Sequence, residues 1–201
     1  MAARPPKVGF IGTGSMGKPM ANRILQNFEL AVHNRTRLDP DQFGGSFEIV
    51  DSPAELASPC YIVVLCLPTI QTHRDVLSGD KSLLPGDRLR IVIHTGTTGP
   101  SLAREMEEAL AARSMELVDA PISGGPERAA RGDLVTMASG PEAALEAARP
   151  IIPSYSGKIV DFGPNVGSAQ TMKLVNNVLV TSNLVLAAEA MLLGLSSTLY
   201  V

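Results

Sequence analysis

Short apolar runs alternate with amphipathic segments along most of the chain. The apolar runs are rich in β-branched residues, which is typical of buried strands. The expected strands are residues 7–11, 30–33, 47–50, 62–67, 89–94, 115–118, 134–138 and 158–161. Between them apolar residues recur at helical spacing, as Met16, Met20 and Ile24 do. The expected helices are residues 15–26, 52–58, 101–113 and 142–152. This alternation predicts an α/β fold with a mostly parallel sheet covered by helices on both faces.

The pattern changes after Gly163. From Ser168 to about Gly194 no Pro or Gly interrupts the sequence, which predicts one helix roughly 40 Å long at 1.5 Å per residue. After Lys173 the only charged side chain in this helix is Glu189. A helix so apolar needs cover on most sides, which we expect from more chain or from another subunit.

This change divides the chain into two expected parts. Residues 1–162 are expected to form a nucleotide-binding domain, and residues 163–201 a linker and the first helix of an incomplete all-helical domain. The polar side chains inside the long helix argue against a membrane span. They are Asn176, Asn177, Asn183 and Glu189.

Composition narrows the function classes. With 17 Lys and Arg against 20 Asp and Glu, the 201-residue chain has a formal charge of −3 and no long basic run. Nucleic acid is therefore not an expected partner. The first seven residues lack the apolar stretch of a signal peptide, so a cytoplasmic location is expected.

A glycine-rich turn follows the first expected strand and opens the first expected helix. Its six residues are Gly12, Thr13, Gly14, Ser15, Met16 and Gly17. In this G-x-G-x-x-G pattern the first glycine permits a tight turn, the second lets the backbone approach a pyrophosphate, and the third lets helix and strand pack closely. The helix N-terminus then faces the anion with free N–H groups. A doubly wound Rossmann domain that binds a dinucleotide is the predicted fold, and a glycine turn without a ligand is the alternative.

The end of the second strand favours one form of that dinucleotide. An NAD site needs an acidic residue there to hold the ribose 2′-hydroxyl, but residues 33–37 contain none. Asn34, Arg35 and Thr36 stand there instead, followed by Arg37. A guanidinium pairs well with a phosphate, so the sequence predicts preference for NADP (NADPH) over NAD. The alternative is that these are solvated loop residues.

The three histidines do not form a recognisable site. His33, His73 and His94 are scattered, and none has the spacing of a metal site. We expect them to be structural or solvated, and no metal is predicted.

Four motifs follow one another in the order of a known enzyme family. The glycine turn is the first, and residues 67–69, Leu-Pro-Thr at the end of a strand, are the second. The third is 119–125, Asp-Ala-Pro-Ile-Ser-Gly-Gly, and the fourth is 163–167, Gly-Pro-Asn-Val-Gly, followed by Lys173 and Asn177. Together they resemble the β-hydroxyacid dehydrogenase family, which includes 3-hydroxyisobutyrate dehydrogenase and semialdehyde reductases, with 6-phosphogluconate dehydrogenase as a distant relative. The resemblance covers essentially the whole chain.

The resemblance implies a role for each motif. The substrate carboxylate would be bound by Ser123, Gly124 and Gly125, through a hydroxyl and backbone N–H groups. Lys173 matches the family's catalytic lysine, and Asn177, one helical turn on, would help to hold the substrate. The nicotinamide side of the cofactor site would be lined by Leu67, Pro68 and Thr97.

The implied activity is oxidoreduction. A small 3-hydroxy acid and its oxo acid or semialdehyde would be interconverted by hydride transfer, with NADP as cofactor and Lys173 as general acid/base. The chemistry is sound on its own terms, because a lysine can stabilise the charge that builds on a carbonyl oxygen and donate the proton. A snorkelling surface lysine is the alternative. The family further implies a homodimer once the helical domain is completed, and admits a mitochondrial location.

Some residues depart from the family pattern. Relatives usually have an acid and a serine where this chain has 94–96, His-Thr-Gly, and they often have glycines and alanine at 126–128, here Pro-Glu-Arg. Relatives also continue into an all-helical domain. A truncated NADP-binding module that binds cofactor or dimerises without turnover is therefore the alternative function. An imine reductase fits less well, because those proteins generally lack a lysine at the Lys173 position.

Overall fold

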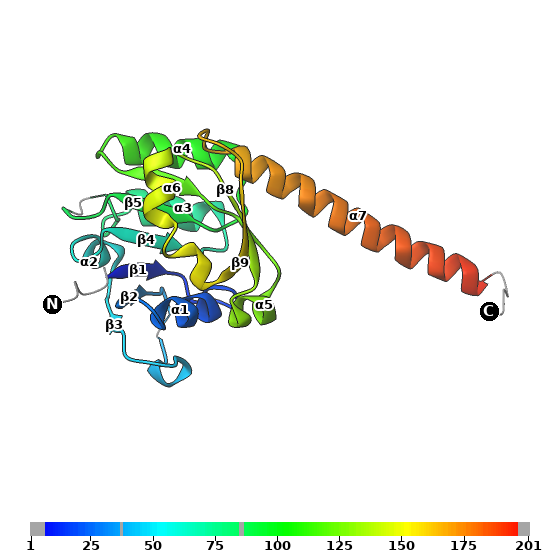
Figure 1. The fold of residues 1–201 in the computed structure, drawn as a ribbon, viewed down its shortest axis with the longest axis horizontal. Helices are drawn as coiled ribbons and strands as arrows, with labels where there is room; N and C mark the ends of the chain where they lie inside the picture. Colours follow the sequence, from blue (N-terminus) through cyan, green and yellow to red (C-terminus); the bar gives the residue numbers. More distant parts are fainter. Residues whose placement is uncertain (1–6, 37, 85–86, 197–201) are drawn as a thin grey trace.

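One long helix extends from an otherwise rounded α/β body (Figure 1). The computed structural model describes residues 7–36, 38–84 and 87–196. The body has a six-stranded sheet, and every neighbouring pair of its strands is parallel. In spatial order the strands are β3 (Glu48–Ile49), β2 (Leu30–His33), β1 (Val8–Ile11), β4 (Ile62–Leu65), β5 (Ile91–His94) and β6 (Glu116–Asp119). This 3-2-1-4-5-6 order is that of a doubly wound Rossmann fold, which confirms the predicted fold class.

The central strands are buried on both faces because two separate cores enclose the sheet. In β4, Ile62 and Val64 belong to one core, whereas Val63 and Leu65 belong to the other. Successive strand side chains point to opposite faces, so a fully apolar strand supplies both cores at once.

Helices connect many of the strands. Those that the sequence predicted are α1 (Gly17–Leu25), α2 (Pro53–Ala57), α4 (Pro100–Ala111) and α6 (Glu142–Ala148). The Ser52 hydroxyl accepts a hydrogen bond from the Glu55 N–H and caps α2. Residues 142–152 were expected as one helix, but α6 ends before Pro150, whose missing N–H cannot continue it, and a 3₁₀ turn follows at Ile152–Ser154.

Two helices were missed, and the longer of them is α3 (Ile70–Ser78). α3 follows β4 and has a capping box in which Thr69 and Thr72 bond reciprocally. Its buried side chains are His73 and Leu77, so one of the two residues on its inner face is polar. The apolar periodicity is therefore weak, although the capping pair was a usable signal.

The expected single sheet is in fact two sheets, and this corrects the prediction for 134–138 and 158–161. β8 (Leu134–Ala138) pairs parallel with β9 (Ser156–Asp161) and antiparallel with β7 (Ile122–Ser123). Only Ala120 and Pro121 separate β6 from β7, and a parallel connection needs a much longer crossover. The short helix α5 (Pro126–Arg131), also unpredicted, links β7 to β8.

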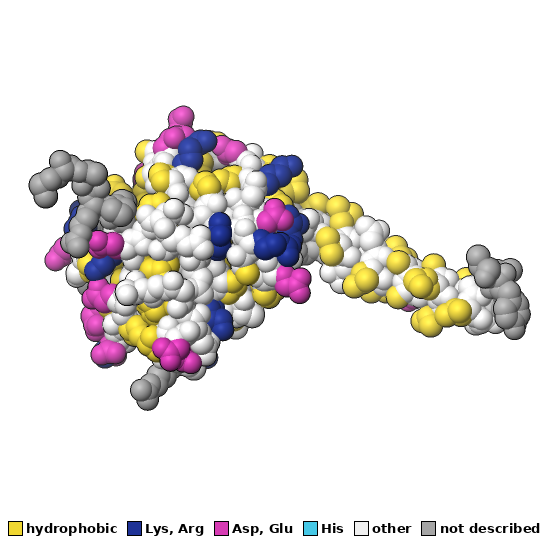
Figure 2. Space-filling model, turned by 60° about the horizontal axis from the view of Figure 1, so that its bottom comes forward, with side chains coloured by type: hydrophobic (Ala, Val, Ile, Leu, Met, Phe, Trp, Pro, Cys, Tyr) yellow, Lys and Arg dark blue, Asp and Glu magenta, His cyan; other side chains and the backbone are white. Residues whose placement is uncertain are grey.

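The predicted long helix is present as α7 (Ser168–Ser196), and it leaves the body after its first turns. It contacts α4 and β8 near its start, and its buried residues are Ala169, Gln170 and Lys173. Beyond them its apolar side chains are exposed, as Leu184 is at 70% and Leu195 at 77%. Figure 2 shows hydrophobic side chains along the helix and most charges on the body.

By length and composition alone, α7 could cross a membrane. Its 29 residues have a mean hydropathy of 1.9 over the most apolar window, and none of that window is buried. Core helices of soluble proteins pass the same test, so this observation is weak evidence. The absence of a membrane span therefore stays a prediction, as does the domain boundary after residue 162.

Candidate functional site

The glycine turn between β1 and α1 has the geometry that a pyrophosphate requires. Gly12 has φ +94°, and a Cβ there would overlap the carbonyl of Cys66 on β4's end. A Cβ at Gly17 would overlap the carbonyl oxygen of Gly12, so helix and strand approach as closely as glycine allows. At Gly14 a Cβ would meet no other described atom within 4 Å, which leaves open space against the backbone. The conformation and space at the three glycines therefore suit the three roles that the pattern predicts.

The turn is tied to the end of β2. The Thr13 N–H donates to Asn34 Oδ1 over 3.0 Å, and Asn34 Nδ2 donates to Thr36 Oγ1 over 2.8 Å. The Thr13 hydroxyl is buried and has no hydrogen-bond partner among the described residues. An unpaired hydroxyl beside an open glycine turn suits a phosphate oxygen, so these residues fit a dinucleotide.

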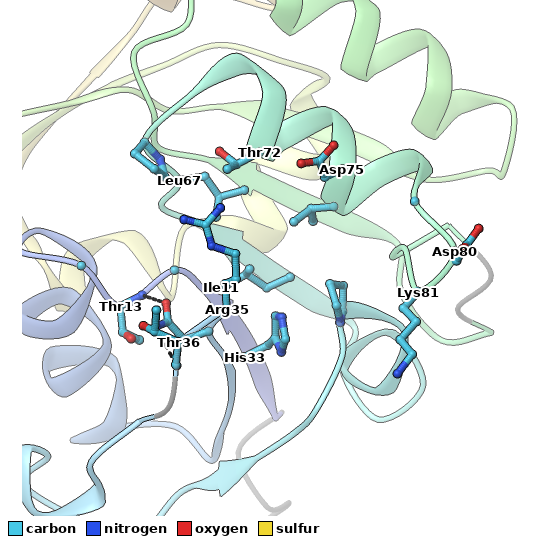
Figure 3. Close-up of a pocket in the computed structure, with 17 residues that line it drawn as sticks. Ile11, Thr13, His33, Arg35, Thr36, Leu67, Thr72, Asp75, Asp80 and Lys81 are labelled. Atoms are coloured by element: carbon cyan, nitrogen blue, oxygen red, sulfur yellow. Dashed lines mark hydrogen bonds between the residues drawn. The ribbon is translucent and has the colours of Figure 1, made fainter.

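A cavity of about 490 Å³ extends from the turn and has the size of a ligand pocket (Figure 3). The predicted cofactor residues that line it are Gly12, Thr13, Gly14, Asn34, Arg35, Thr36, Leu67 and Pro68. Figure 3 shows the Arg35 side chain extending from the end of β2 toward Leu67 on the opposite wall. Ser15, Met16, Gly17 and Thr97 are predicted cofactor residues that do not line this cavity. Arg37 lies outside the described residues.

Sequence reasoning missed one wall of the cavity. It comes from α3 and the turn after it, and its residues include Thr72, Asp75, Val76 and Lys81. They were missed because α3 itself was not predicted. The wall places a mixed polar and apolar surface opposite Arg35, a lining of the kind that small-molecule sites have.

Lys173 occupies a secluded position on α7. The residue is only 7% exposed, and none of the described acidic side chains forms an ion pair with it. Desolvation by burial lowers the pKa of its ammonium from the ordinary value of 10.5. Asn177 lies one turn further on the same helix, is half-buried, and its Oδ1 accepts a 3.4 Å hydrogen bond from Asn176. A lysine with a lowered pKa and no partner is suited to proton transfer.

The predicted carboxylate-binding segment lies against the same strand as α7. Ser123 on β7 stands opposite Val135 of β8, and α7 also packs on β8. Gly124 and Gly125 have φ +151° and +112°, and at Gly125 a Cβ would meet no described atom within 4 Å. The backbone is therefore open to a ligand at Gly125, whereas Gly124 is packed against Leu134 and Arg128.

Arg128, the first cation after this segment, does not offer a free anion receptor. Arg128 Nε donates to the carbonyl and the carboxylate of Asp133, at 2.8 and 3.2 Å. A substrate carboxylate would therefore have to compete with Asp133 for this guanidinium. Residues 126–128 depart from the family pattern, but their one cation, Arg128, is already paired with Asp133. It therefore adds no free positive charge beside Ser123.

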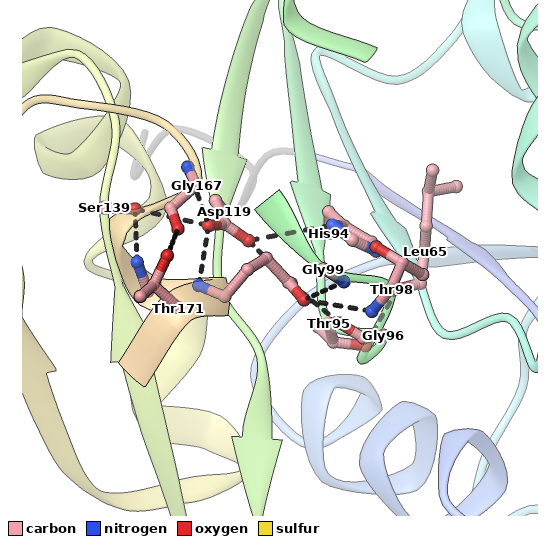
Figure 4. A network of polar contacts seen from close by, with 12 residues as sticks. Leu65, His94, Thr95, Gly96, Thr98, Gly99, Asp119, Ser139, Gly167 and Thr171 are labelled. Carbon is pink, nitrogen blue, oxygen red and sulfur yellow. Dashed lines mark hydrogen bonds and ion pairs between the residues drawn. The ribbon is translucent and has the colours of Figure 1, made fainter. Parts of the chain in front are cut away.

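A buried polar network holds the start of α7. Asp119, at the end of β6, accepts hydrogen bonds through Oδ2 from the N–H groups of Gly167 and Gln170, at 3.1 and 3.2 Å. Ser139 Oγ accepts from the N–H of Ala169 at 3.1 Å and donates to Asp119. These acceptors cap the helix and its dipole, so they fix the segment from which Lys173 projects (Figure 4).

His94 lies beside this network with His73 packed against it, whereas His33 lines the cavity at the end of β2. His94 and Asp119 are fully buried, and His94 Nδ1 is 3.7 Å from Asp119 Oδ1. The sequence indicated no such histidine–aspartate contact, because the two residues come from different strands. No group of three or more His, Cys, Asp or Glu side chains able to hold a metal ion occurs within 7–36, 38–84 and 87–196.

Comparisons with known proteins agree with this geometry. Residues 7–163 match the family described as the NAD binding domain of 6-phosphogluconate dehydrogenase. Mitochondrial 3-hydroxyisobutyrate dehydrogenase of Mus musculus is 32% identical over 205 residues, covering 99% of this chain and 60% of that protein. L-threonate dehydrogenase of Cupriavidus necator is 32% identical over 194 residues, covering 94% of this chain and 64% of that protein.

A solved structure of Psf3 in complex with NADP+ and 2-OPP has a similar fold. It is 29% identical, with a TM-score of 0.83, over 96% of this chain and 69% of the Psf3 chain. This chain thus spans about 60% of the length of the curated relatives that it matches.

Proposed function

The chain belongs to the family of the NAD binding domain of 6-phosphogluconate dehydrogenase, and on this premise we propose that it is the cofactor-binding and catalytic part of an NADP-dependent oxidoreductase. Its substrate is a small 3-hydroxy acid or the corresponding oxo acid or semialdehyde. The relatives named as dehydrogenases of 3-hydroxyisobutyrate and L-threonate support this substrate class.

The observation that carries the proposal is the state of Lys173. Burying a cation without an acidic partner lowers the stability of the fold. A purely structural role for Lys173 would not offset this loss of stability. The residue lies on the helix whose start is held by the strand end at Asp119. Function explains why the cation is retained there.

The residues divide the reaction between them. When bound, the nicotinamide cofactor supplies or accepts the hydride. The Lys173 ammonium donates a proton to the carbonyl oxygen during reduction, and the neutral amine takes it back during oxidation. Ser123 and the backbone N–H groups of Gly124 and Gly125 bind the substrate carboxylate, and Asn177 orients the substrate beside Lys173.

Preference for NADP rests on the end of β2. Beside the glycine turn, Asn34 accepts a hydrogen bond from the Thr13 N–H and donates to Thr36, and Arg35 projects over the cavity. This cluster offers a guanidinium to a 2′-phosphate and no carboxylate to a 2′-hydroxyl. The complex of the similar Psf3 structure with NADP+ is consistent with this preference.

The exposed apolar side chains of α7 support a further part of the proposal. Cover from protein, either additional chain or the second subunit of a homodimer, would remove this surface from water. A cytoplasmic enzyme, with neither nucleic acid nor membrane as partner, remains the reading that we propose.

NADPH consumption by the purified chain tests the proposed function. The substrates would be glyoxylate, succinic semialdehyde, methylmalonate semialdehyde and tartronate semialdehyde. Lys173→Ala should lower turnover by about a hundredfold or more and leave NADPH binding intact. Lys158→Ala, which removes an exposed lysine from β9, is the matched control and should retain turnover. Equal turnover of Lys173→Ala and the parent chain would refute the role of Lys173.

The exposed apolar surface of α7 also supports a second candidate function. This surface would equally serve a module that binds NADP and assembles with other protein without turnover. NADPH binding without turnover of any substrate, by a folded chain, would favour this module over the enzyme.

A further inference from the structure

The side-chain amide of Gln170 is the centre of the buried network at the start of α7. It is fully buried, and all of its principal hydrogen-bonding directions are used. Gln170 Oε1 accepts from the backbone N–H groups of Thr98 and Gly99, both at 3.0 Å. Gln170 Nε2 donates to the Gly96 carbonyl at 2.9 Å and to Asp119 Oδ1 at 2.8 Å. Figure 4 shows the partners of this amide, which are Asp119 at the end of β6 and Gly96, Thr98 and Gly99 in the loop that follows β5.

These hydrogen bonds bracket one residue of the predicted cofactor site. Gly96 and Thr98 flank Thr97, which is itself exposed and makes none of these bonds. The loop lies at the carboxyl end of a parallel strand, where ligands bind in open α/β sheets. The amide therefore controls where the backbone presents Thr97.

The same amide is rigidly related to Lys173. Gln170 and Lys173 are three residues apart on α7, and they are two of the helix's three buried residues. Residues with this spacing lie on the same face of a helix. One side chain thus links the loop that carries Thr97 to the helical turn that carries Lys173.

Within the described residues, the N–H groups of Thr98 and Gly99 and the carbonyl of Gly96 hydrogen-bond to this amide alone, while the Thr98 hydroxyl contacts His94 Nε2 at 3.4 Å. Gly99 has φ +84° and precedes α4 without a side-chain cap. Gly96 is packed so closely that a Cβ would come within 3.1 Å of both His73 and His94. Without the amide, two N–H groups, one carbonyl and one oxygen of the buried Asp119 would each lose a hydrogen bond.

We infer that Gln170 is a positioning residue, which holds the Thr97 loop against the catalytic turn of α7 so that the nicotinamide half of the cofactor faces Lys173. This inference rests on the proposed function. It predicts that loss of the amide disturbs the nicotinamide half of the site and leaves the adenosine phosphate half, on the other side of the glycine turn, intact.

The test compares two ligands that differ in the nicotinamide half. NADPH carries the nicotinamide, whereas 2′,5′-ADP carries only the adenosine and its phosphates. Gln170→Met keeps the length of the side chain and removes every hydrogen bond of the amide. Gln26→Met, at the exposed end of α1, is the matched control. Binding of both ligands and the rate of NADPH oxidation are measured for each chain.

We expect Gln170→Met to bind NADPH about tenfold more weakly and to turn over at least about tenfold more slowly, with 2′,5′-ADP affinity within about threefold of the parent chain. Gln170→Asn keeps the amide on a side chain that is one methylene shorter, so it cannot reach all four partners at once. It should fall between the parent chain and Gln170→Met in NADPH affinity, and it replaces the Met variant if that chain does not fold.

Three results would overturn the inference. Unchanged NADPH affinity and turnover in both variants would show that the amide positions nothing, and equal losses for NADPH and 2′,5′-ADP would show a general structural role instead. A parent chain that binds neither ligand would refute the proposed function together with the inference. A parent chain that binds both, with variants like the parent, would refute the inference alone.

Discussion

His73 and His94 lie edge to face, with their ring centroids 4.6 Å apart and an interplanar angle of 82°. Both side chains are fully buried. His73 Nδ1 donates to the Thr69 carbonyl at 2.7 Å, while His73 Nε2 and His94 Nδ1 have no hydrogen-bond partner in the described part of the chain. The pair packs under Gly96 and so supports the loop that Gln170 holds.

This pair predicts a loss of stability in acid. Burial, and then the neighbouring His94, lower the pKa of His73 from 6.5 to about 4, although the bond to Thr69 opposes the shift. Between these values the unfolded chain binds a proton that the folded chain excludes, so stability falls as the pH falls from about 6.5 towards 4. From about pH 7 to about pH 5 the loss through His73 is about 2 kcal/mol.

Denaturant unfolding at both pH values measures this loss. His73→Asn keeps a donor for Thr69 and removes the titrating ring, so its free energy of unfolding should fall less over the same interval. Parallel losses in the parent chain and in His73→Asn would contradict the prediction.

Two glycines of the same turn should respond differently to alanine. At Gly14 a Cβ meets no described atom within 4 Å, so Gly14→Ala should change the free energy of unfolding by less than about 0.5 kcal/mol. The added methyl group would fill the space in which the backbone meets the pyrophosphate, and NADPH affinity should fall about tenfold or more. At Gly17 the Cβ overlaps the Gly12 carbonyl, so Gly17→Ala should destabilise the fold itself, by about 2 kcal/mol or more.

Thermal or denaturant unfolding and NADPH titration of the two variants separate these effects. Equal stability of Gly14→Ala and Gly17→Ala would show that the close approach at Gly17 does not limit packing.

Arg35 is expected to decide between the two cofactors. Removal of a charge-assisted contact to the 2′-phosphate costs roughly 2 kcal/mol, so Arg35→Ala should bind NADPH about thirtyfold more weakly. NADH lacks that phosphate, and its affinity should change little. Arg113→Ala, which removes an exposed arginine after α4, is the control for a general effect of charge. Equal losses for NADPH and NADH would reject the role of Arg35.

Lys173 predicts opposite pH profiles for the two directions of the reaction. Burial lowers the pKa of its ammonium below 10.5. Reduction needs the protonated form, so its rate should fall as the pH rises through this lowered pKa. Oxidation needs the neutral amine, and its rate should rise over the same interval. Initial rates measured in both directions across the alkaline range test this, and a reduction rate that stays constant there would argue against Lys173 as the proton donor.

The elements that the sequence predicted well are those whose signals are local. Strands such as β4 are apolar on both faces, and the turn from Gly12 to Gly17 carries its conformational requirement in the glycines themselves. The family resemblance, which the match over residues 7–163 confirms, singled out Lys173 and Ser123 as well. Their assigned roles remain predictions that the experiments above address.

Tertiary structure decided what depends on residues far apart in the chain. The buried face of α3 includes a histidine in place of a further apolar residue, because His73 packs on His94 of strand β5. Nothing in the local sequence distinguishes Gln170 from other helical residues. Its contact with Asp119, 51 positions earlier in the chain, arises only in the folded structure. Periodicity and glycine patterns report the conformation of a segment, because that conformation follows from local sterics and burial. Which buried donor meets which acceptor depends on how β5, β6 and α7 converge, and only the folded chain specifies it.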